Sequence, residues 1–535
     1  MTRSLTRIAL TVTLGTALSK IGGLARQLVI AGIFGIGAAY DAYNYAYILP
    51  GFFLILLGGV NGPFHNAIVT VLSRKSKREA SYVLAAISTI VSTALTLITL
   101  ILIFGADPLM RIVGPGLSDE VHTIAVFQLQ IMAPIALFAG LIGLGYGSLN
   151  ARDSFFIPAI SPLISSLVIM SLIGIFLLQE GPLIGAKNLG LKGGLILAIG
   201  TLIGALLQCL IQIPALANKG IAKFKIIWDL KHPGVKEVLK IIVPATLSSG
   251  MLQINVFTDL FFASGILGAA AGLSYASFLI QAPLGLLSNA LIIPLLPSFS
   301  RLANLGDQKL LILRIRKGLM LSLASMIALG AVFTTLGAPI VALVYARGAF
   351  ENNAISLVTG LLIAYGIGMP AYLCRDLLVR VFYALGDGKT PFNLSLIAIA
   401  LNIIFDWLLV GGPTPWGEQM PFNFGAPGIV FATVAINFLT CSALLLRLKS
   451  QIKELPLKEW VLDGSKLLIA GSISGLAAWT MRTVINWPEG FIGLFSQVSF
   501  SATTSIFVFG LIGSAVGVKE VKDLQLLLTK KIISL

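Results

Sequence analysis

The chain has 535 residues, of which 57% are hydrophobic and only 11% are charged, and its mean hydropathy is +0.95. This composition excludes a water-soluble globular protein and indicates an integral membrane protein. The net charge of +15 raises the question of nucleic-acid binding. Because the basic residues lie in short segments between apolar runs, we expect no nucleic-acid partner. The three cysteines, Cys209, Cys374 and Cys441, lie in apolar runs, which argues against a disulfide framework or a paired-cysteine metal site.

Apolar runs long enough to cross a bilayer recur along the whole chain. Arg3 and Arg7 precede the first run, but no small-residue cleavage site follows a short apolar core, so we interpret this run as a spanning helix. We predict an all-α polytopic membrane protein with about fourteen transmembrane helices. The predicted spans cover 8–36, 41–72, 81–105, 122–149, 157–178, 189–217, 241–265, 270–300, 313–346, 355–383, 391–411, 426–448, 462–485 and 490–517.

The distribution of basic residues predicts the orientation of these spans. Most of the 37 Lys and Arg residues lie in the segments that share the side of the N-terminus. Because cytoplasmic segments carry the excess of Lys and Arg, we expect both termini in the cytoplasm. The two largest basic segments, 218–240 and 301–317, either mark topology only or also contact anionic head groups of the inner leaflet.

The first span contains charged residues within its apolar run. Gly15, Ser19, Gly22 and Arg26 follow one another at offsets that place them on one helix face, and Lys20 lies about 100° from Ser19. A charge at membrane depth is costly and normally faces a cavity or a partner. We therefore interpret this face as a cationic wall that binds an anion. The alternative is that Lys20 and Arg26 extend from a helix end to the membrane surface.

The two halves of the chain share a weak repeat. Asn44–Tyr47 leads to a proline in the second span, and Ser274–Ser277 leads to a proline in the eighth. We expect the span before each to be broken by small residues, at Gly22-Gly23 in the first and near Pro244 and 248–250 in the seventh. Repeated halves with interrupted helices at matching places are typical of alternating-access transporters.

A second polar group lies in the later spans. Asn402 and Asp406 are four residues apart, so their side chains share one helix face. With Asp259 and the hydroxyl of Thr433 as further oxygen donors, they form a candidate site for a hard cation. The alternatives are an interhelical hydrogen bond or an ion pair with an arginine of the tenth span.

The second span is interrupted by Pro63, which should break the helix. His65 follows it and either titrates near neutral pH or is a hydrogen-bonded structural residue. The sequence contains no Walker A motif, no His/Cys metal cluster and no G-x-S-x-G elbow, which argues against an enzyme. A scaffold would not need Lys20 and Arg26 inside a span, so transport is the favoured class.

Several stretches of the sequence resemble a known protein family, and the resemblance covers nearly the whole chain. Ser19–Arg26 is one, and the most specific are Arg347–Phe350 and Phe382–Pro391. The sequence resembles the MviN/MurJ family of lipid II flippases, within the superfamily of multidrug, oligosaccharidyl-lipid and polysaccharide exporters. The resemblance implies six-helix lobes at 1–217 and 241–448 around a central cavity. A basic cytoplasmic linker would cover 218–240, and two extra helices within 462–517 would form a groove for a polyprenyl tail.

The resemblance also implies a function. Lipid II, the lipid-linked precursor of peptidoglycan, would pass from the inner to the outer leaflet of the bacterial inner membrane by alternating access. The alternatives are export of another polyprenyl-linked glycan or cation-coupled drug antiport. The expected protein is a multi-pass monomer with no enzymatic activity, whose partners are lipid II, or a similar polyprenyl-pyrophosphate glycolipid, and membrane lipids.

The family pattern assigns roles to particular positions. Ser19, Arg26 and Asp41 match its cavity residues, and Lys20 stands where arginine is common. The residues that match its cation site, with Na⁺ as the candidate coupling ion and no other cofactor expected, are Asp259, Asn402, Asp406, Thr433 and, through its carbonyl, Ile429.

The sequence departs from the family pattern in its cavity cations. No Lys or Arg occurs between Gln27 and Arg74, and Ser277-Phe278 replaces an acidic–arginine pair. We expect Arg375 to supply the missing cation of the second lobe. The alternative is a structural pair with a neighbouring aspartate, Asp376 or Asp406.

Overall fold

The structure is a computed structural model that describes residues 5–59, 62–180, 189–221, 225–251, 253–292, 295–411, 422–452, 455–518 and 520–522. All regular structure within these ranges is helical, as predicted. The chain forms two compact units, one of Met1–Ala271 with Arg347–Phe350 and the other of Gly272–Ala346 with Glu351–Leu535. The lobe boundaries expected from the sequence stay a prediction.

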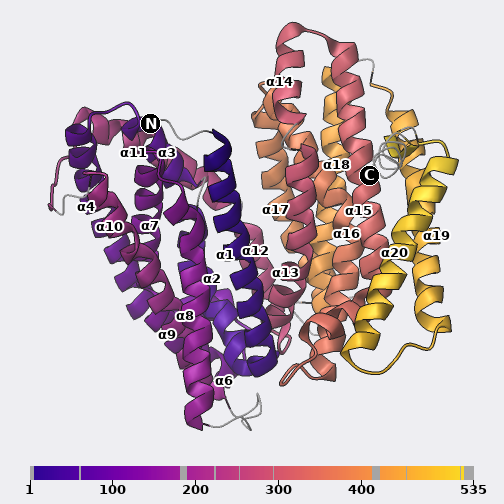
Figure 1. The fold of residues 1–535 in the computed structure, drawn as a ribbon, viewed down its shortest axis with the longest axis horizontal. Coiled ribbons are helices and arrows are strands. Elements are labelled where there is room, and N and C mark those ends of the chain that lie inside the picture. Colours follow the sequence, from indigo (N-terminus) through magenta and orange to yellow (C-terminus); the bar gives the residue numbers. More distant parts are fainter. Residues whose placement is uncertain are drawn as a thin grey trace. The chain divides into compact units, whose positions relative to one another are not determined.

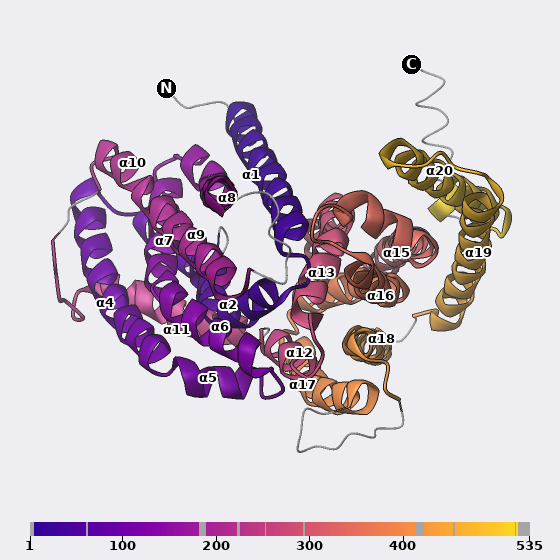
Figure 2. The ribbon, with the colours of Figure 1, turned by 90° about the horizontal axis from the view of Figure 1, so that it is seen from below.

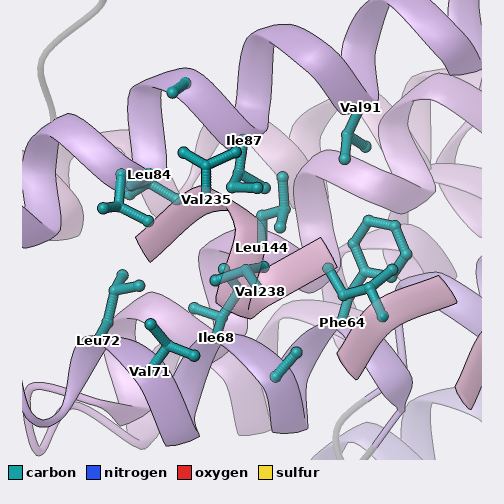
Figure 3. Close-up of a cluster of buried hydrophobic side chains, with 14 of the residues drawn as sticks. Phe64, Ile68, Val71, Leu72, Leu84, Ile87, Val91, Leu144, Val235 and Val238 are labelled. Atoms are coloured by element: carbon teal, nitrogen blue, oxygen red, sulfur yellow. The ribbon is translucent and has the colours of Figure 1, made fainter. Parts of the chain in front are cut away.

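The first unit contains twelve helices among its described residues (Figure 1). They are α1 (Leu5–Phe34), α2 (Ala38–Leu57), α3 (Pro63–Leu72), α4 (Lys77–Phe104), α5 (Ala106–Val113), α6 (Asp119–Met132), α7 (Ile135–Asn150), α8 (Phe156–Glu180), α9 (Gly190–Leu210), α10 (Gln212–Asn218), α11 (Pro233–Met251) and α12 (Ile254–Ala263). One apolar cluster joins α3, α4, α7 and α11, as Figure 3 shows for Ile68, Ile87, Leu144 and Val235. This cluster fixes α11 against α3 and α4 within the first unit.

The second unit begins within α13 and continues to the C-terminus. Its helices are α13 (Ala269–Leu287), α14 (Leu295–Leu305), α15 (Gln308–Tyr345), α16 (Asn352–Ala384), α17 (Lys389–Val410), α18 (Ala426–Gln451), α19 (Leu457–Val484) and α20 (Phe491–Ala515), with a short π-helical segment, Ser288–Ile292, between α13 and α14. The longest, α15, packs along α16 on one side and along α19 and α20 on another (Figures 1 and 2).

The described residues include eleven helices long and apolar enough to span a membrane, or up to twelve if the bent pair α6 and α7 is one span. The expected count of fourteen is therefore not confirmed. The predicted spans 41–72 and 241–265 are absent from this set because each is divided into two helices, of which α2 and α11 are not apolar enough and α3 and α12 are too short. In the first of them, α2 ends at Leu57 and Pro63 opens α3. Proline has no N–H to donate to the preceding turn, so the predicted break at Pro63 is confirmed.

The predicted break in the first span is wrong, because α1 runs without interruption through Gly22-Gly23. The reason lies in the packing of α1 on α8. A Cβ atom on Gly22 would lie 2.2 Å from a methyl group of Leu163, and one on Gly15 would lie 3.0 Å from Cβ of Ala159. These glycines permit close helix approach, which is how small residues commonly act between membrane helices.

The motif Arg347–Phe350 connects α15 and α16 and packs on the end of α1. The Ala349 N–H donates to the Gly32 carbonyl at 2.7 Å. Gly348 has a φ of 57°, and a Cβ atom there would lie 2.1 Å from the same carbonyl. Only glycine fits this backbone conformation and this approach, which explains why the motif carries glycine at this position.

The motif Phe382–Pro391 forms the connection between α16 and α17. The Asp387 carboxylate accepts hydrogen bonds from the N–H and hydroxyl of Thr390 and from Gln451, at 3.0, 2.7 and 2.7 Å. The bonds from Thr390 lower the pKa of Asp387 below its usual value. The motif therefore ties the start of α17 to the end of α18 through one ionised side chain.

Three contacts hold α19 against α15. Near one end, Arg316 binds Asp463 at 2.6 Å, and it also binds Glu520, beyond α20, at 2.9 Å. In the middle, a Cβ atom on Gly471 would lie 2.3 Å from a methyl group of Ile327. Near the other end, Arg482 donates to the Thr335 carbonyl at 2.9 Å. Within the second unit, α19 is thus fixed to α15 by charge at one end and by close approach further along.

The orientation derived from charge can be tested with single cysteines in a variant that lacks the three native ones. Cysteines at Arg74 and Gln308 should be shielded from an impermeant thiol reagent added to intact cells, while those at Glu120 and Asn353 should react. All four positions are exposed, so folding should not limit labelling. Membrane permeabilisation should expose the first pair and serves as the control. Labelling of Arg74→Cys in intact cells would overturn the orientation.

Candidate functional site

In the first unit, three tyrosines of α2 form a stacked row. Tyr40, Tyr43 and Tyr47 share one helix face, with ring centroids 5.8 and 5.5 Å apart in sequence order. Gln27 of α1 donates to the Tyr40 hydroxyl at 3.0 Å, and the hydroxyls of Tyr43 and Thr201 are 2.9 Å apart. The row is therefore fixed by α1 on one side and by α9 on the other.

Arg26 of α1 lies beside this row. Its guanidinium is close enough to Tyr43 and Tyr47 to act on them electrostatically. The side chain is half-buried, and its Nε atom is buried with no hydrogen-bond partner among the described residues. A buried donor of a charged group is costly to leave unpaired. An anion bound at this position would supply the missing acceptor.

The remaining residues of the predicted cationic face have other surroundings. The Ser19 hydroxyl donates to the Ala159 carbonyl of α8 at 2.8 Å, and Gly15 and Gly22 also face α8. Lys20 is exposed. The structure therefore gives Gly15, Ser19 and Gly22 a packing role, and Arg26 is the member of that face with an unpaired buried donor.

Asp41 of α2 forms hydrogen bonds at the start of α13. It is 2% exposed, and its two carboxylate oxygens accept the backbone N–H groups of Gly268 and Ala271 at 3.2 and 3.0 Å. The first N–H groups of a helix have no partner within the helix, and a carboxylate there also interacts favourably with the helix dipole. Asp41 thus caps α13 from α2, across a long stretch of sequence.

Part of the polar group predicted in the later spans is present in the second unit. Asn402 and Asp406 of α17 are fully buried, and the Asn402 amide donates to the Asp406 carboxylate at 2.7 Å. Ile429 and Thr433 lie on α18, which packs against α17. The Thr433 hydroxyl is buried with no hydrogen-bond partner among the described residues. A carboxylate, an amide and an unpaired hydroxyl are oxygen donors that suit a hard cation, so this donor set fits Na⁺.

Asp259 is the one member of the expected cation set outside the second unit. It lies on α12, which belongs to the first unit. Its place in the cation site stays a prediction. Among the described residues no three or more His, Cys, Asp or Glu side chains form a metal-binding group.

The arginines of α16 have different partners. Arg375 donates to the Asn437 side chain of α18 at 2.5 Å, and Asn437 donates to the Thr433 carbonyl at 2.8 Å. Arg380 forms a salt bridge with Asp376 at 3.3 Å. Arg375 is therefore linked through Asn437 to the same helix turn as the candidate cation ligands, whereas Arg380 has a carboxylate partner of its own.

An apolar groove of about 430 Å³ lies between α15, α16 and α19. Ile327, Gly366, Leu468 and Trp479 are among the residues that line it. Since most of α19 lies within 462–517, the groove involves one of the helices predicted to hold a lipid tail.

Sequence reasoning did not identify the tyrosine row or Asn437. A signal for both was present in the spacing. Tyr40, Tyr43 and Tyr47 follow the offsets of one helix face, and Asn437 lies one turn after Thr433. The spacing does not show which residues these side chains contact, because their partners, Thr201 and Arg375, come from distant parts of the chain.

The helical fold, the apolar spans and the buried polar groups within them define a polytopic membrane transporter. The family model of "Lipid II flippase MurJ" matches residues 30–497. This chain belongs to the lipid II flippase MurJ family, a family of transporters and not of enzymes.

Relatives agree with this assignment. A "Probable lipid II flippase MurJ" from Synechocystis is 43% identical over 525 residues, which is 98% of this chain and 96% of that protein. The "Lipid II flippase MurJ" of Burkholderia cenocepacia is 30% identical over 76% of this chain and 78% of its own length.

Solved structures show the same architecture. A lipid II flippase MurJ in an inward closed conformation matches with a TM-score of 0.75 at 25% identity, and the match covers 95% of this chain and 98% of that one. An inward-facing multidrug transporter of the MATE family matches with a TM-score of 0.63 at 17% identity, over 82% of this chain and 95% of its own. The second likeness concerns the fold alone.

The position of Asp41 predicts a stability effect. Asp41→Ala should lower the free energy of unfolding by about 1–3 kcal/mol, because two buried N–H groups lose their acceptors. Asp41→Asn keeps one acceptor oxygen and should cost less. Thermal unfolding of the purified protein in detergent measures both, with Asp119→Ala at an exposed position as the control. A wild-type melting temperature for Asp41→Ala would contradict the capping role.

Proposed function

We propose that this protein moves lipid II from the inner to the outer leaflet of the cytoplasmic membrane by alternating access. Membership of the lipid II flippase MurJ family supports the substrate. The observation in the structure that carries the proposal is the unpaired, buried Nε of Arg26 beside the tyrosine row. The protein is a multi-pass protein of the inner membrane, and we propose that both termini lie in the cytoplasm.

The roles of the substrate-binding residues follow from their chemistry. Arg26 donates charge-assisted hydrogen bonds to the pyrophosphate, with Lys20 as a second, mobile charge nearby. Arg375 supplies a cation from the second unit, where Asn437 fixes one edge of its guanidinium. Because Asn437 is neutral, the positive charge of Arg375 is oriented without being cancelled.

The polyprenyl tail occupies the apolar groove between α15, α16 and α19. The groove is lined mainly by apolar side chains and by the small residues Gly330, Gly471 and Gly475. A hydrocarbon chain there avoids contact with the charges that hold the head group. The substrate is thus bound by two chemically different regions of the protein.

A sodium ion or the membrane potential resets the carrier. The residues that would hold Na⁺ are Asn402, Asp406 and Thr433 of the second unit, with the Ile429 carbonyl and Asp259 as the further ligands that the family pattern implies. When bound, the cation supplies positive charge to the Asp406 carboxylate. The alternative functions are export of another polyprenyl-linked glycan and cation-coupled drug antiport, and the likeness to a multidrug transporter supports the second through the fold only.

The primary experiment is leaflet-resolved labelling of lipid II in cells depleted of this protein. Depletion should trap lipid II in the inner leaflet, and expression of this chain should restore its outer-leaflet signal. If the signal persists without the protein, lipid II is not its substrate.

Two arginines should be required for transport and not for folding. Arg26→Ala and Arg375→Ala should each abolish flipping in the same labelling assay, while the proteins remain inserted and folded. Arg111→Ala is the matched control, because Arg111 is exposed and paired with Asp107. Phe278→Arg added to Arg375→Ala should restore part of the activity, since it returns a cation to the second unit. Normal flipping by Arg375→Ala would refute its role.

The cation site predicts a specific loss of stabilisation. Sodium, compared with choline at equal ionic strength, should raise the melting temperature of the purified protein, because a ligand that binds only the folded state stabilises it. Asp406→Asn keeps the shape and removes one charge, so it should abolish the shift. Asp376→Asn, which alters a carboxylate paired with Arg380, should keep it. An unchanged sodium shift in Asp406→Asn would make Asp406 structural.

A further inference from the structure

A second cavity lies in the first unit, away from Arg26 and the tyrosine row. Its volume is about 540 Å³, within the range of roughly 300–1,000 Å³ typical of small-molecule sites. Leu84 of α4, Leu144 of α7 and Leu216 of α10 line it, and the first two also belong to the apolar cluster of Figure 3. The cavity therefore has an apolar floor that is part of the rigid core of this unit.

One wall of the cavity is polar. Ser88, Thr89, Ser92 and Thr93 of α4 line it, and the Thr89 and Thr93 hydroxyls donate to carbonyls of their own helix. Gln212 also lines it and is only 2% exposed. The Gln212 amide nitrogen donates to the Gln208 carbonyl, but its oxygen has no hydrogen-bond partner among the described residues. A buried amide oxygen is costly to leave unpaired, so Gln212 adds an unsatisfied polar group to this wall.

The mouth of the cavity is formed by the segment 225–230. Lys225 lines the mouth and is itself exposed. Beyond it, the side chains of Ile226, Trp228 and Leu230 are 92, 61 and 46% exposed, on alternate residues. Exposed apolar and tryptophan side chains in a basic segment are typical of a position at the membrane surface.

The segment is fixed to α4. The Ile227 N–H donates to the Thr89 hydroxyl at 3.2 Å, and the Tyr82 hydroxyl donates to the Asp229 carboxylate at 2.8 Å. These contacts direct the odd-numbered side chains toward α4 and leave Ile226, Trp228 and Leu230 facing outward. The mouth and the membrane-facing side chains are thus held in one fixed arrangement.

We propose that this cavity binds an anionic glycerophospholipid. The phosphate lies at Lys225, the polar wall meets the glycerol region, and one acyl chain covers the apolar floor. A soluble anion would leave the apolar floor and the exposed tryptophan unexplained. A zwitterionic lipid would place a second cation beside Lys225, which costs electrostatic energy.

Photo-crosslinking in vesicles tests the proposal. The full-length protein is reconstituted in phosphatidylcholine vesicles that contain either phosphatidylglycerol or phosphatidylcholine with a diazirine on the acyl chain. We expect the phosphatidylglycerol probe to label α4 and α10 peptides several-fold more than the phosphatidylcholine probe. Lys225→Glu should reduce that labelling to the phosphatidylcholine level. Lys231→Glu changes an exposed lysine that directly follows the segment and does not line the cavity, and it should leave the labelling unchanged.

A second variant separates the cavity from the charge at its mouth. Ser92→Phe fills the cavity without touching Lys225 and should abolish labelling of α10 by either probe. Unchanged melting temperatures show that both variants fold. Equal labelling by the two probes, or labelling insensitive to Lys225→Glu, would overturn the proposal and identify the cavity as a site of ordinary surrounding lipid. Preferential labelling by a photoreactive polyprenyl pyrophosphate would also overturn it and assign the cavity to the transported substrate.

Discussion

The structure depends on one constraint, which is that the interior of a bilayer offers no hydrogen-bond partners to the backbone. Helices meet this constraint along their length, and each interruption needs a local solution. At the start of α13, the solution is the Asp41 carboxylate, which accepts two N–H groups from a helix more than two hundred residues away in sequence. At the connection between α15 and α16, the Ala349 N–H is satisfied by the Gly32 carbonyl of α1. Irregular backbone is thus tied to distant helices in the same unit.

The same constraint separates structural charges from charges available to a substrate. Arg316 and Arg380 are neutralised by carboxylates of their own unit. Arg26 and Arg375 differ from them, because Arg26 acts electrostatically on Tyr43 and Tyr47 and the hydrogen bond of Arg375 is to a neutral amide. A guanidinium held by neutral groups keeps its charge for an incoming anion, although it costs stability while it is empty. This cost is the physical reason for our proposal that these two residues bind the pyrophosphate.

In our proposals, the two ends of an amphipathic lipid are bound by separate surfaces of the protein. The groove beside α19 exists because Gly471 lets that helix approach α15 closely, while Arg316 and Arg482 hold its two ends. In the first unit, the cavity beside α4 has a similar division, with a lysine at its mouth and leucines beneath. Both sites are shallow spaces between helices, which suits ligands that enter sideways from the membrane.

Composition and periodicity were sufficient to predict an all-helical membrane protein, the break at Pro63 and the shared face of Asn402 and Asp406, because these are properties of one helix at a time. The motifs Arg347–Phe350 and Phe382–Pro391 were also sufficient to indicate the family. The partner of each polar side chain was decided by tertiary structure. Gly22 could permit either a bend or a close contact, and only the presence of Leu163 settles which. From the sequence, Asp41 could bind substrate or cap a helix. In the structure it accepts the N–H of Gly268, and the sequence alone could not show this because it does not record which distant helices meet.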